Sequence, residues 1–247
     1  MTSIDFTFLG CGDAFGSGGR FNTCFHVKAP SATFLIDCGA SSMISIRKHD
    51  VDPNAIDAIL ITHLHGDHFG GLPFFILDAQ LGSRRTRPLV IAGPPGLRER
   101  LFQAMEVFFP GSSGIPQKFE LDIVEFTPDE PVTLGALAVM PHLVRHPCGA
   151  PPLALRVEVD GKSLCYTGDT EWVDAIVDAA KGVDLFVCEV YFDDKPVRFH
   201  LNWQTVKQHL PAIGARRVIV THMSPEMLSR VGSLGIEAAE DGLRLSI

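Results

Sequence analysis

The stretch AILITHLHGDHFGG, residues 58–71, decides how the rest of the chain is interpreted. Its apolar start, 58–61, is typical of a buried strand. Four side chains of the kinds that bind metals then follow within six residues: His63, His65, Asp67 and His68. Because alternate residues of an extended segment share a face, the first two histidines can reach one ion, while Asp67 and His68 turn toward a second.

The chemistry of these side chains indicates which metals they would bind. Imidazole nitrogens together with carboxylate oxygens suit zinc, and also manganese or iron. The alternative is a polar loop whose histidines only cap the following helix. Buried imidazoles and carboxylates at this density would then need partners that the apolar flanking residues do not offer. We therefore expect two divalent metal ions, Zn²⁺ first, with Mn²⁺ or Fe²⁺ as alternatives.

The order of strand-like and helix-like segments predicts the fold. Short β-rich runs predict strands at 4–9, 23–27, 33–36, 58–61, 89–91, 121–126, 137–140, 153–159, 163–166, 185–187 and 217–220. Helical spacing predicts helices at 42–49, 72–81, 97–108, 171–180 and 202–213. This order favours an α/β (α+β) protein, a four-layer αββα sandwich with two mixed β-sheets. No Pro/Gly/Ser-rich linker divides the chain, so one domain over 1–247 is expected.

Composition and charge narrow the class of protein. The chain is 46% hydrophobic and 20% charged, which is typical of a globular protein. Its net charge of −8 argues against a surface that binds a nucleic-acid backbone over its whole extent. The basic run at Arg84, Arg85 and Arg87 is expected to be a solvated loop. The six cysteines are scattered along the chain without paired spacing, so most are expected to be reduced core residues. No apolar stretch approaches the roughly 20 residues of a membrane span, and the start MTSIDFTFLG has no basic and apolar leader pattern, so a cytoplasmic protein is expected.

The metal-binding stretch resembles the signature HxHxDH of the metallo-β-lactamase superfamily, which is complete here, and the likeness extends along nearly the whole chain. The resemblance implies later ligands at His146, at Asp169 in YTGDT (166–170) and at His222 in VIVTHMS (218–224). One ion would be held by His63, His65, His146 and Asp169, and the other by Asp67, His68, Asp169 and His222. His142 is the alternative to His146, which is favoured because a Pro-Cys-Gly turn follows it.

Within the superfamily the chain resembles the ribonuclease Z and phosphodiesterase-like branch. The Gly-rich opening LGCGDAFGSGGRFNT (9–23) carries this likeness, together with CEVYF (188–192) and a histidine 22 residues before His222. The resemblance implies that this histidine, His200, protonates the leaving group and that Glu189 orients it. Asp67, His200 and Glu189 are thus the candidate catalytic residues. The alternative for His200 is an exposed or capping residue before the helix at 202–213.

The chain also differs from this branch in a feature that bears on the substrate. No long basic arm for gripping transfer RNA occurs, so a small or cyclic-nucleotide-like phosphodiester is expected, and precursor transfer RNA is not. Alternative functions are a lactone, thioester or amide hydrolase with weak β-lactamase activity, a di-iron redox protein, and a binding protein that keeps the fold without catalysis. Dimers are common among such proteins, so a homodimer is one expected state.

Several residues near the expected site have simpler interpretations. The Gly-rich segment 10–19 lacks the Lys-Ser/Thr ending of a phosphate-binding loop and is expected to be a hairpin turn. Ordinary core or rim packing is expected for Cys148, Trp172 and the phenylalanines Phe69, Phe74 and Phe75.

Overall fold

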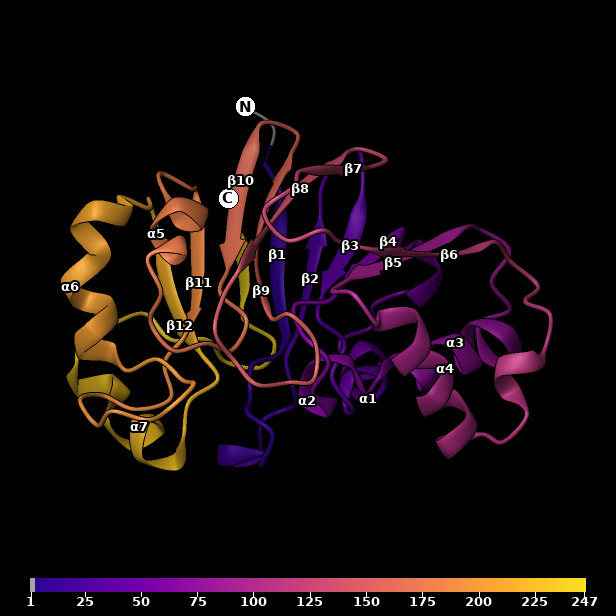
Figure 1. Ribbon diagram of the computed structural model, residues 1–247, viewed down its shortest axis with the longest axis horizontal. Coiled ribbons are helices and arrows are strands. Elements are labelled where there is room, and N and C mark those ends of the chain that lie inside the picture. The colour runs from indigo at the N-terminus through magenta and orange to yellow at the C-terminus, as the bar shows by residue number, and fades with distance from the viewer. Residues whose placement is uncertain (1–2) are drawn as a thin grey trace.

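The computed structural model describes residues 3–247 and contains two β-sheets with helices on their outer faces (Figure 1). The strands are β1 Asp5–Gly10, β2 Cys24–Lys28, β3 Thr33–Ile36, β4 Ala58–Leu60, β5 Leu89–Gly93, β6 Leu121–Glu125, β7 Val132–Leu134, β8 Leu137–Leu143, β9 Leu153–Val159, β10 Lys162–Tyr166, β11 Leu185–Glu189, β12 Val218–Thr221 and β13 Arg244–Ser246. The helices are α1 Ser42–Lys48, α2 Gly66–Phe69, α3 Leu72–Leu77, α4 Leu97–Phe108, α5 Ala175–Ala180, α6 Trp203–Ile213 and α7 Pro225–Arg230.

Both sheets are mixed, as the sequence predicted. The first has seven strands in the order β13-β1-β2-β3-β4-β5-β6, and the second has six in the order β12-β11-β10-β9-β8-β7. Antiparallel hairpins form β1 to β3 and β7 to β10, while β3 to β6 and β10 to β12 run parallel. Parallel strands bring their carboxyl ends to one edge of each sheet. The loops that carry function in such sheets lie at that edge.

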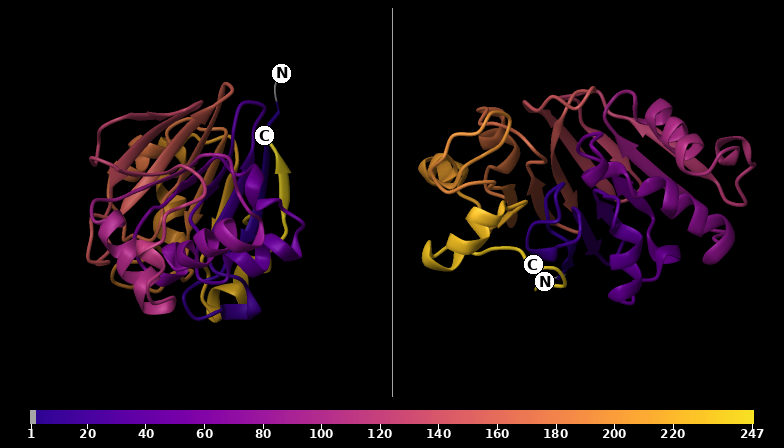
Figure 2. Two further views of the ribbon diagram at one scale, coloured as in Figure 1. Left: turned by 90° about the vertical axis from the view of Figure 1, so that its right-hand side faces the viewer. Right: turned by 90° about the horizontal axis from the view of Figure 1, so that it is seen from below.

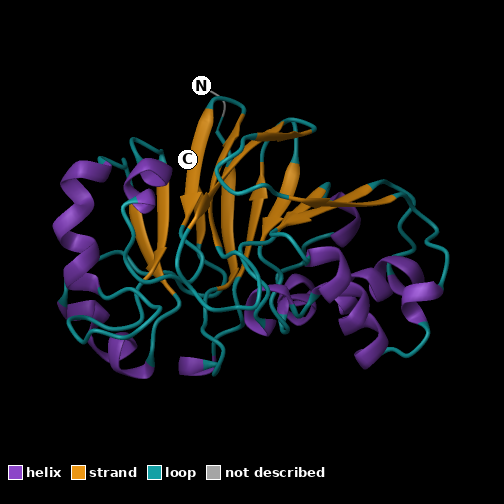
Figure 3. Ribbon diagram, viewed as in Figure 1, coloured by secondary structure: helices purple, strands orange, loops and turns teal. Residues whose placement is uncertain are grey.

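Three apolar clusters separate four layers. One cluster lies between the sheets and includes Phe8, Phe25 and Tyr166, with the last two rings 4.9 Å apart. A second lies between the first sheet and α1, α3 and α4, and a third between the second sheet and α5, α6 and α7. Figure 3 shows the helices outside the strands, and Figure 2 shows the two halves of the chain on opposite sides of the molecule when seen from below. The αββα sandwich is therefore confirmed.

Local sequence signals set the helix boundaries. The side chain of Asn202 accepts a hydrogen bond from the Thr205 N–H at 2.9 Å and begins α6, and Gly214, with a left-handed φ of 61°, ends it. Ser224 caps α7 in the same way and is followed by Pro225. In the described residues 3–247, no helix is both long enough and apolar enough to cross a membrane.

The predicted segments differ from the observed elements in a few places. The predicted helices at 97–108 and 202–213 match α4 and α6 closely, and the Gly-rich segment connects the antiparallel pair β1 and β2, as a hairpin does. The predicted helix at 171–180 begins only at Ala175, because Glu171 forms a β-bridge with Arg145 and the residues up to 174 continue as a loop and turn. Strands β7 and β13 and helices α2 and α7 were not predicted.

The prediction of a solvated basic loop is wrong for Arg85. Its side chain is 1% exposed, and its guanidinium donates hydrogen bonds to the carbonyl oxygens of Pro53 at 3.0 Å and Ile56 at 2.7 Å. A further hydrogen bond reaches the Pro88 carbonyl at 2.5 Å. The guanidinium thus donates to backbone carbonyls of the segments on either side of it. Arg87, with 60% of its side chain exposed, is solvated as predicted.

Candidate metal centre

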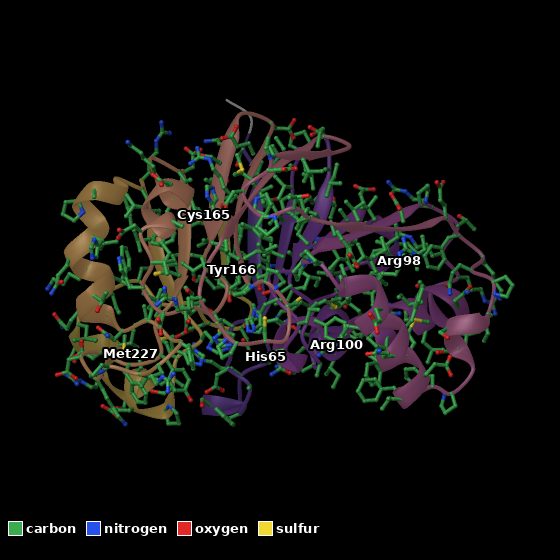
Figure 4. All side chains as sticks on the ribbon, viewed as in Figure 1. His65, Arg98, Arg100, Cys165, Tyr166 and Met227 are labelled. Atoms are coloured by element: carbon green, nitrogen blue, oxygen red, sulfur yellow. The ribbon has the colours of Figure 1, made fainter. Side chains whose placement is uncertain are left out.

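The candidate metal-binding side chains come from both sheets and meet at one edge of the sandwich. The residues that carry them lie in the loops that follow β4, β8, β10 and β12. Figure 4 shows His65 at the lower centre of the molecule, below Tyr166 at the end of β10 and between Met227 of α7 and Arg100 of α4. The structure therefore brings together all the residues for which the sequence predicted a metal-binding role, which are His63, His65, Asp67, His68, His146, Asp169 and His222.

Three histidines form the first group. His63, His65 and His146 each offer a ring nitrogen within 4.8 Å of the others. The Nε2 of His146 lies 3.0 Å from the Nδ1 of His65. Asp169 Oδ2 lies 3.9 Å from the Nε2 atoms of His63 and His146. These three histidines can hold one ion, and the Asp169 carboxylate lies beside them.

Two carboxylates and two histidines form the second group. His68 Nε2 lies 3.3 Å from Asp67 Oδ2 and 3.3 Å from Asp169 Oδ1. His222 Nε2 lies 3.2 Å from Asp67 Oδ2 and 3.4 Å from Asp169 Oδ2. A tetrahedral ion with bonds of about 2.0–2.1 Å separates its ligands by roughly 3.3–3.4 Å. One donor atom from each of these four side chains lies within 4.8 Å of the others, so together they could hold one divalent ion.

The electrostatics of the second group favour a bound cation. Burial alone would raise the pKa of Asp169, but His222 and His68 outweigh it and hold that pKa well below its usual value. Burial would lower the pKa of His222, but Asp169 and the hydrogen bond of Asp67 raise it to about 9. Carboxylates that raise the pKa of neighbouring imidazoles stabilise positive charge at their position. A divalent ion would supply that charge without the protons.

Unpaired buried atoms point to the same conclusion. Within residues 3–247, His63 Nε2, His68 Nε2 and Asp169 Oδ1 are buried without a hydrogen-bond partner of acceptable geometry. Such atoms cost free energy unless something satisfies them. They converge with the other donor atoms of the two groups. The residues present thus fit two divalent metal ions.

Neighbouring groups hold the Nδ1 atoms of His63, His68 and His146, which fixes how these three rings are turned. The Nδ1 of His68 lies 2.7 Å from Asp37 Oδ2, and the Nδ1 of His63 lies 3.1 Å from the Thr62 hydroxyl. The Nδ1 of His146 lies 2.9 Å from the Phe199 carbonyl. Partners of this kind orient metal-binding imidazoles and select their tautomer.

Asp37 is a site residue that the sequence alone did not reveal. It follows β3, is fully buried, and accepts hydrogen bonds from the N–H and hydroxyl of Thr62, both at 2.8 Å. It therefore fixes the start of the histidine-rich loop as well as His68. The signal that could have found it is an acid placed directly after the apolar run TFLI and before Cys-Gly.

The backbone around the cluster is tightly packed and partly strained. Gly39 approaches the Asp67 carbonyl so closely that a Cβ there would lie 2.1 Å from that oxygen. Gly168, which precedes the Asp169 carboxylate, has a left-handed φ of 59°. His222 itself has a φ of 58°, which is uncommon for a residue with a side chain, and its N–H is held by the Cys11 carbonyl at 3.1 Å. Such strained residues concentrate at functional sites.

His200 and Glu189 lie beside the second group. His200 Nδ1 is 2.9 Å from Glu189 Oε2, with 22% of the histidine side chain exposed and the glutamate fully buried. Burial lowers the pKa of His200, but the charge and hydrogen bond of Glu189 raise it above its usual value overall. The ring stacks on that of His222 at 5.9 Å between centroids. His200 is thus a partly exposed histidine, paired with a buried carboxylate, at the edge of the cluster.

The alternative histidine and the rim residues lie outside the cluster. His142 has its nearest carboxylate, Asp129, at 3.9 Å and is absent from both groups. Trp172 stacks on His209 at 3.8 Å, and the Cys148 thiol donates to the Ala150 carbonyl at 3.0 Å. All six cysteines are buried and unpaired. These contacts are those of packing residues.

Sequence comparisons place these features among known proteins. The sequence model of the beta-lactamase superfamily domain matches residues 32–223. An uncharacterized protein of Mycobacterium tuberculosis is 30% identical over 231 residues, which cover 91% of this chain and 82% of the relative. Ribonuclease Z of Lachnoclostridium phytofermentans is 27% identical over 276 residues, which cover 91% and 88%.

Solved structures share the fold over nearly the whole chain. The short form of human tRNase Z matches with a TM-score of 0.81 at 25% identity and 98% coverage of each chain. The metallo-beta-lactamase fold protein YhfI from Bacillus subtilis matches with a TM-score of 0.81 at 20% identity and 100% coverage of each. A diphosphatase from the PhnP family matches with 0.76 at 20% identity, covering 98% of this chain and 97% of its own.

Proposed function

Because this chain belongs to the metallo-β-lactamase superfamily, we propose that it hydrolyses a small phosphodiester at a centre of two divalent metal ions. His63, His65, His146 and Asp169 would hold one ion. Asp67, His68, Asp169 and His222 would hold the other. Bound ions would act as Lewis acids on the phosphoryl oxygens and would make water a stronger nucleophile near neutral pH.

The observation that carries the proposal is the pairing of His200 with Glu189 beside the cluster. An alkoxide is a poor leaving group, so cleavage of an unactivated phosphodiester gains from a proton delivered to the leaving oxygen. Glu189 Oε2 accepts from His200 Nδ1 at 2.9 Å, which leaves Nε2 as the second donor of the protonated ring. The raised pKa of His200, which Glu189 maintains against burial, keeps that proton available near neutral pH.

Glu189 and Asp67, the other two candidate catalytic residues, are each held by several contacts. Glu189 is fully buried, and its Oε1 accepts a hydrogen bond from the Thr170 N–H at 2.5 Å. The carboxylate is therefore fixed by the same turn that presents Asp169. Asp67 contacts both His68 and His222 and joins the histidine-rich loop to the loop after β12. The proposed proton donor is thus connected through Glu189 and Thr170 to the turn that carries Asp169.

The size of the substrate follows from charge and from the relatives. Similarity to ribonuclease Z and to a diphosphatase of the PhnP family supports a phosphate ester as the substrate class. The net charge of −8 disfavours a long polyanion such as precursor transfer RNA. A small phosphodiester, of the size of a dinucleotide or cyclic nucleotide, is the substrate we propose.

A single substitution tests the role of His200. We expect His200→Ala to keep both metal ions, because no ligand is lost, and to lower kcat by roughly 10²–10⁴-fold on an unactivated dinucleotide phosphodiester. On bis(p-nitrophenyl) phosphate, whose leaving group needs no proton, the loss should be much smaller. Steady-state kinetics on zinc-loaded protein of measured metal content would give both values. Equal losses on the two substrates, or loss of metal from the variant, would refute the general-acid role.

A substrate panel tests the proposed reaction itself. Phosphodiesters, lactones, thioesters and β-lactams should be compared at equal metal loading, with phosphodiesters showing the highest kcat/KM. Preference for a lactone or thioester would make the chain an acyl hydrolase with the same metal centre. Purified protein with two irons, a visible absorption band and no hydrolysis would contradict the hydrolase proposal.

A further inference from the structure

We infer that Glu171 is a positioning residue that fixes His146 and His200 in one arrangement, although its carboxylate touches neither. The inference rests on the roles proposed above for those two histidines. Glu171 lies two residues after Asp169, at the surface between β10 and α5, with 28% of its side chain exposed. Nothing in its sequence position alone points to a function.

The Glu171 carboxylate joins the segments that carry the two histidines. Its Oε1 lies 3.0 Å from Nη1 of Arg145, the residue before His146. Its Oε2 accepts a hydrogen bond from the N–H of Phe199, the residue before His200, at 3.2 Å. The Glu171 N–H also donates to the Arg145 carbonyl at 3.1 Å. One side chain therefore connects two loops that are more than 50 residues apart in the sequence.

The backbone of Phe199 transmits this contact to both histidines. Its carbonyl accepts a hydrogen bond from His146 Nδ1 at 2.9 Å, which turns His146 Nε2 toward the other ring nitrogens. His200 follows at once, with its Nδ1 held by Glu189. A shift of the Phe199 backbone would therefore move the partner of a metal-binding histidine and the proton donor together.

The conformation of Phe199 explains why it needs a partner. Its φ is 68°, in the left-handed region that bulky side chains rarely adopt. Such a residue keeps its conformation only when surrounding contacts enforce it. The hydrogen bond from the Phe199 N–H to Glu171 is one of those contacts. Without it, the backbone would relax toward an extended conformation and withdraw its carbonyl from His146.

A merely structural Glu171 makes a different prediction. An exposed ion pair with an arginine contributes little to stability and would leave the metal centre unchanged when removed. The chain contains a matched example in Glu237, an exposed carboxylate that accepts from Arg217 Nε at 2.9 Å, at the opposite end of β12 from His222. Glu237→Ala is therefore the control for loss of a surface ion pair.

The test compares Glu171→Ala, Glu171→Gln and Glu237→Ala with the unchanged chain. Zinc retention is measured by competition with a chelator, and kinetics are measured on zinc-saturated protein. We expect Glu171→Ala to release one of the two zinc ions about 10-fold more readily, because the Phe199 carbonyl, which is the partner of His146 Nδ1, is no longer held in place. Its kcat should fall more on a dinucleotide than on bis(p-nitrophenyl) phosphate, with KM nearly unchanged.

The two other variants decide whether the backbone contact is responsible. Glu171→Gln should restore most of the zinc affinity, because its amide oxygen can still accept from the Phe199 N–H. Glu237→Ala should behave as the unchanged chain. Zinc retention that is the same in all variants, or an equal loss in Glu171→Ala and Glu237→Ala, would overturn the inference. An unchanged chain that binds fewer than two zinc ions would overturn the proposed function, and this inference with it.

Discussion

At the residue scale, a single carboxylate faces both groups of the candidate metal centre. The two oxygens of Asp169 lie 3.3–3.9 Å from ring nitrogens of four histidines. We expect Asp169→Ala to lower occupancy of both metal sites, because both lose a ligand. His146→Ala should empty only the site of the three histidines, and His142→Ala should retain both ions. Metal analysis of the purified variants measures this, and an Asp169→Ala chain with two tightly bound ions would contradict the two-metal arrangement.

The same scale shows what a motif can predict and what it cannot. His63 to His68 stand in one short segment, so their spacing alone predicts that they meet. His146, Asp169 and His222 could be selected only by resemblance to a family, because their proximity depends on how two sheets pack. Asp37 acts through His68 and Thr62, and a lone acid after a strand more often just begins a turn. The contacts of Glu171 and His146 with Phe199 are made to its backbone, so they could not be predicted from the residue type at position 199.

At the element scale, strands and helices with a clear local period were predictable. The alternation along β9 and the capped, amphipathic α6 are examples, and their bounds agree with prediction to within a residue. β13 is three residues long and exists because it pairs with β1, more than 230 residues away in the sequence. β7 is also three residues long, with none of them fully buried. Such short elements depend on long-range partners rather than on local propensity.

Arg85 is the element-scale feature whose energy can be tested. It lies after the π-helical turn Asp78–Gly82 and satisfies carbonyls of two neighbouring turns. We expect Arg85→Met to lower the free energy of unfolding by about 2–4 kcal/mol, because buried carbonyls lose charged donors. Arg87→Met is the matched control: its pair with Asp57 is exposed, and its loss should cost at most about 1 kcal/mol. Urea unfolding of both variants measures the difference, and similar midpoints would show that Arg85 is not a structural centre.

At the scale of the whole molecule, the candidate metal centre connects the two sheets. The histidine-rich loop belongs to the first sheet, while His146, Asp169 and His222 follow strands of the second. The apolar cluster between the sheets holds their inner faces together without any metal. The side chains at the edge are instead ionisable, and several buried carboxylates and imidazoles lie close together there. Ions bound there would link the two halves of the chain.

Removal of the metal ions tests this link. A ligand that binds only the folded chain stabilises it by about 4 kcal/mol when its free concentration is 1,000 times Kd. For a chain of this length each kcal/mol shifts the unfolding temperature by roughly 2–4 °C, so stripping zinc from the saturated protein with a chelator should lower Tm by roughly 10 °C or more. Asp169→Ala removes the carboxylate shared by both groups and should show little response to zinc. The comparison needs only calorimetry or circular dichroism, with no substrate. A Tm that is the same with zinc and with chelator would mean that the convergent side chains bind no metal tightly in the folded state.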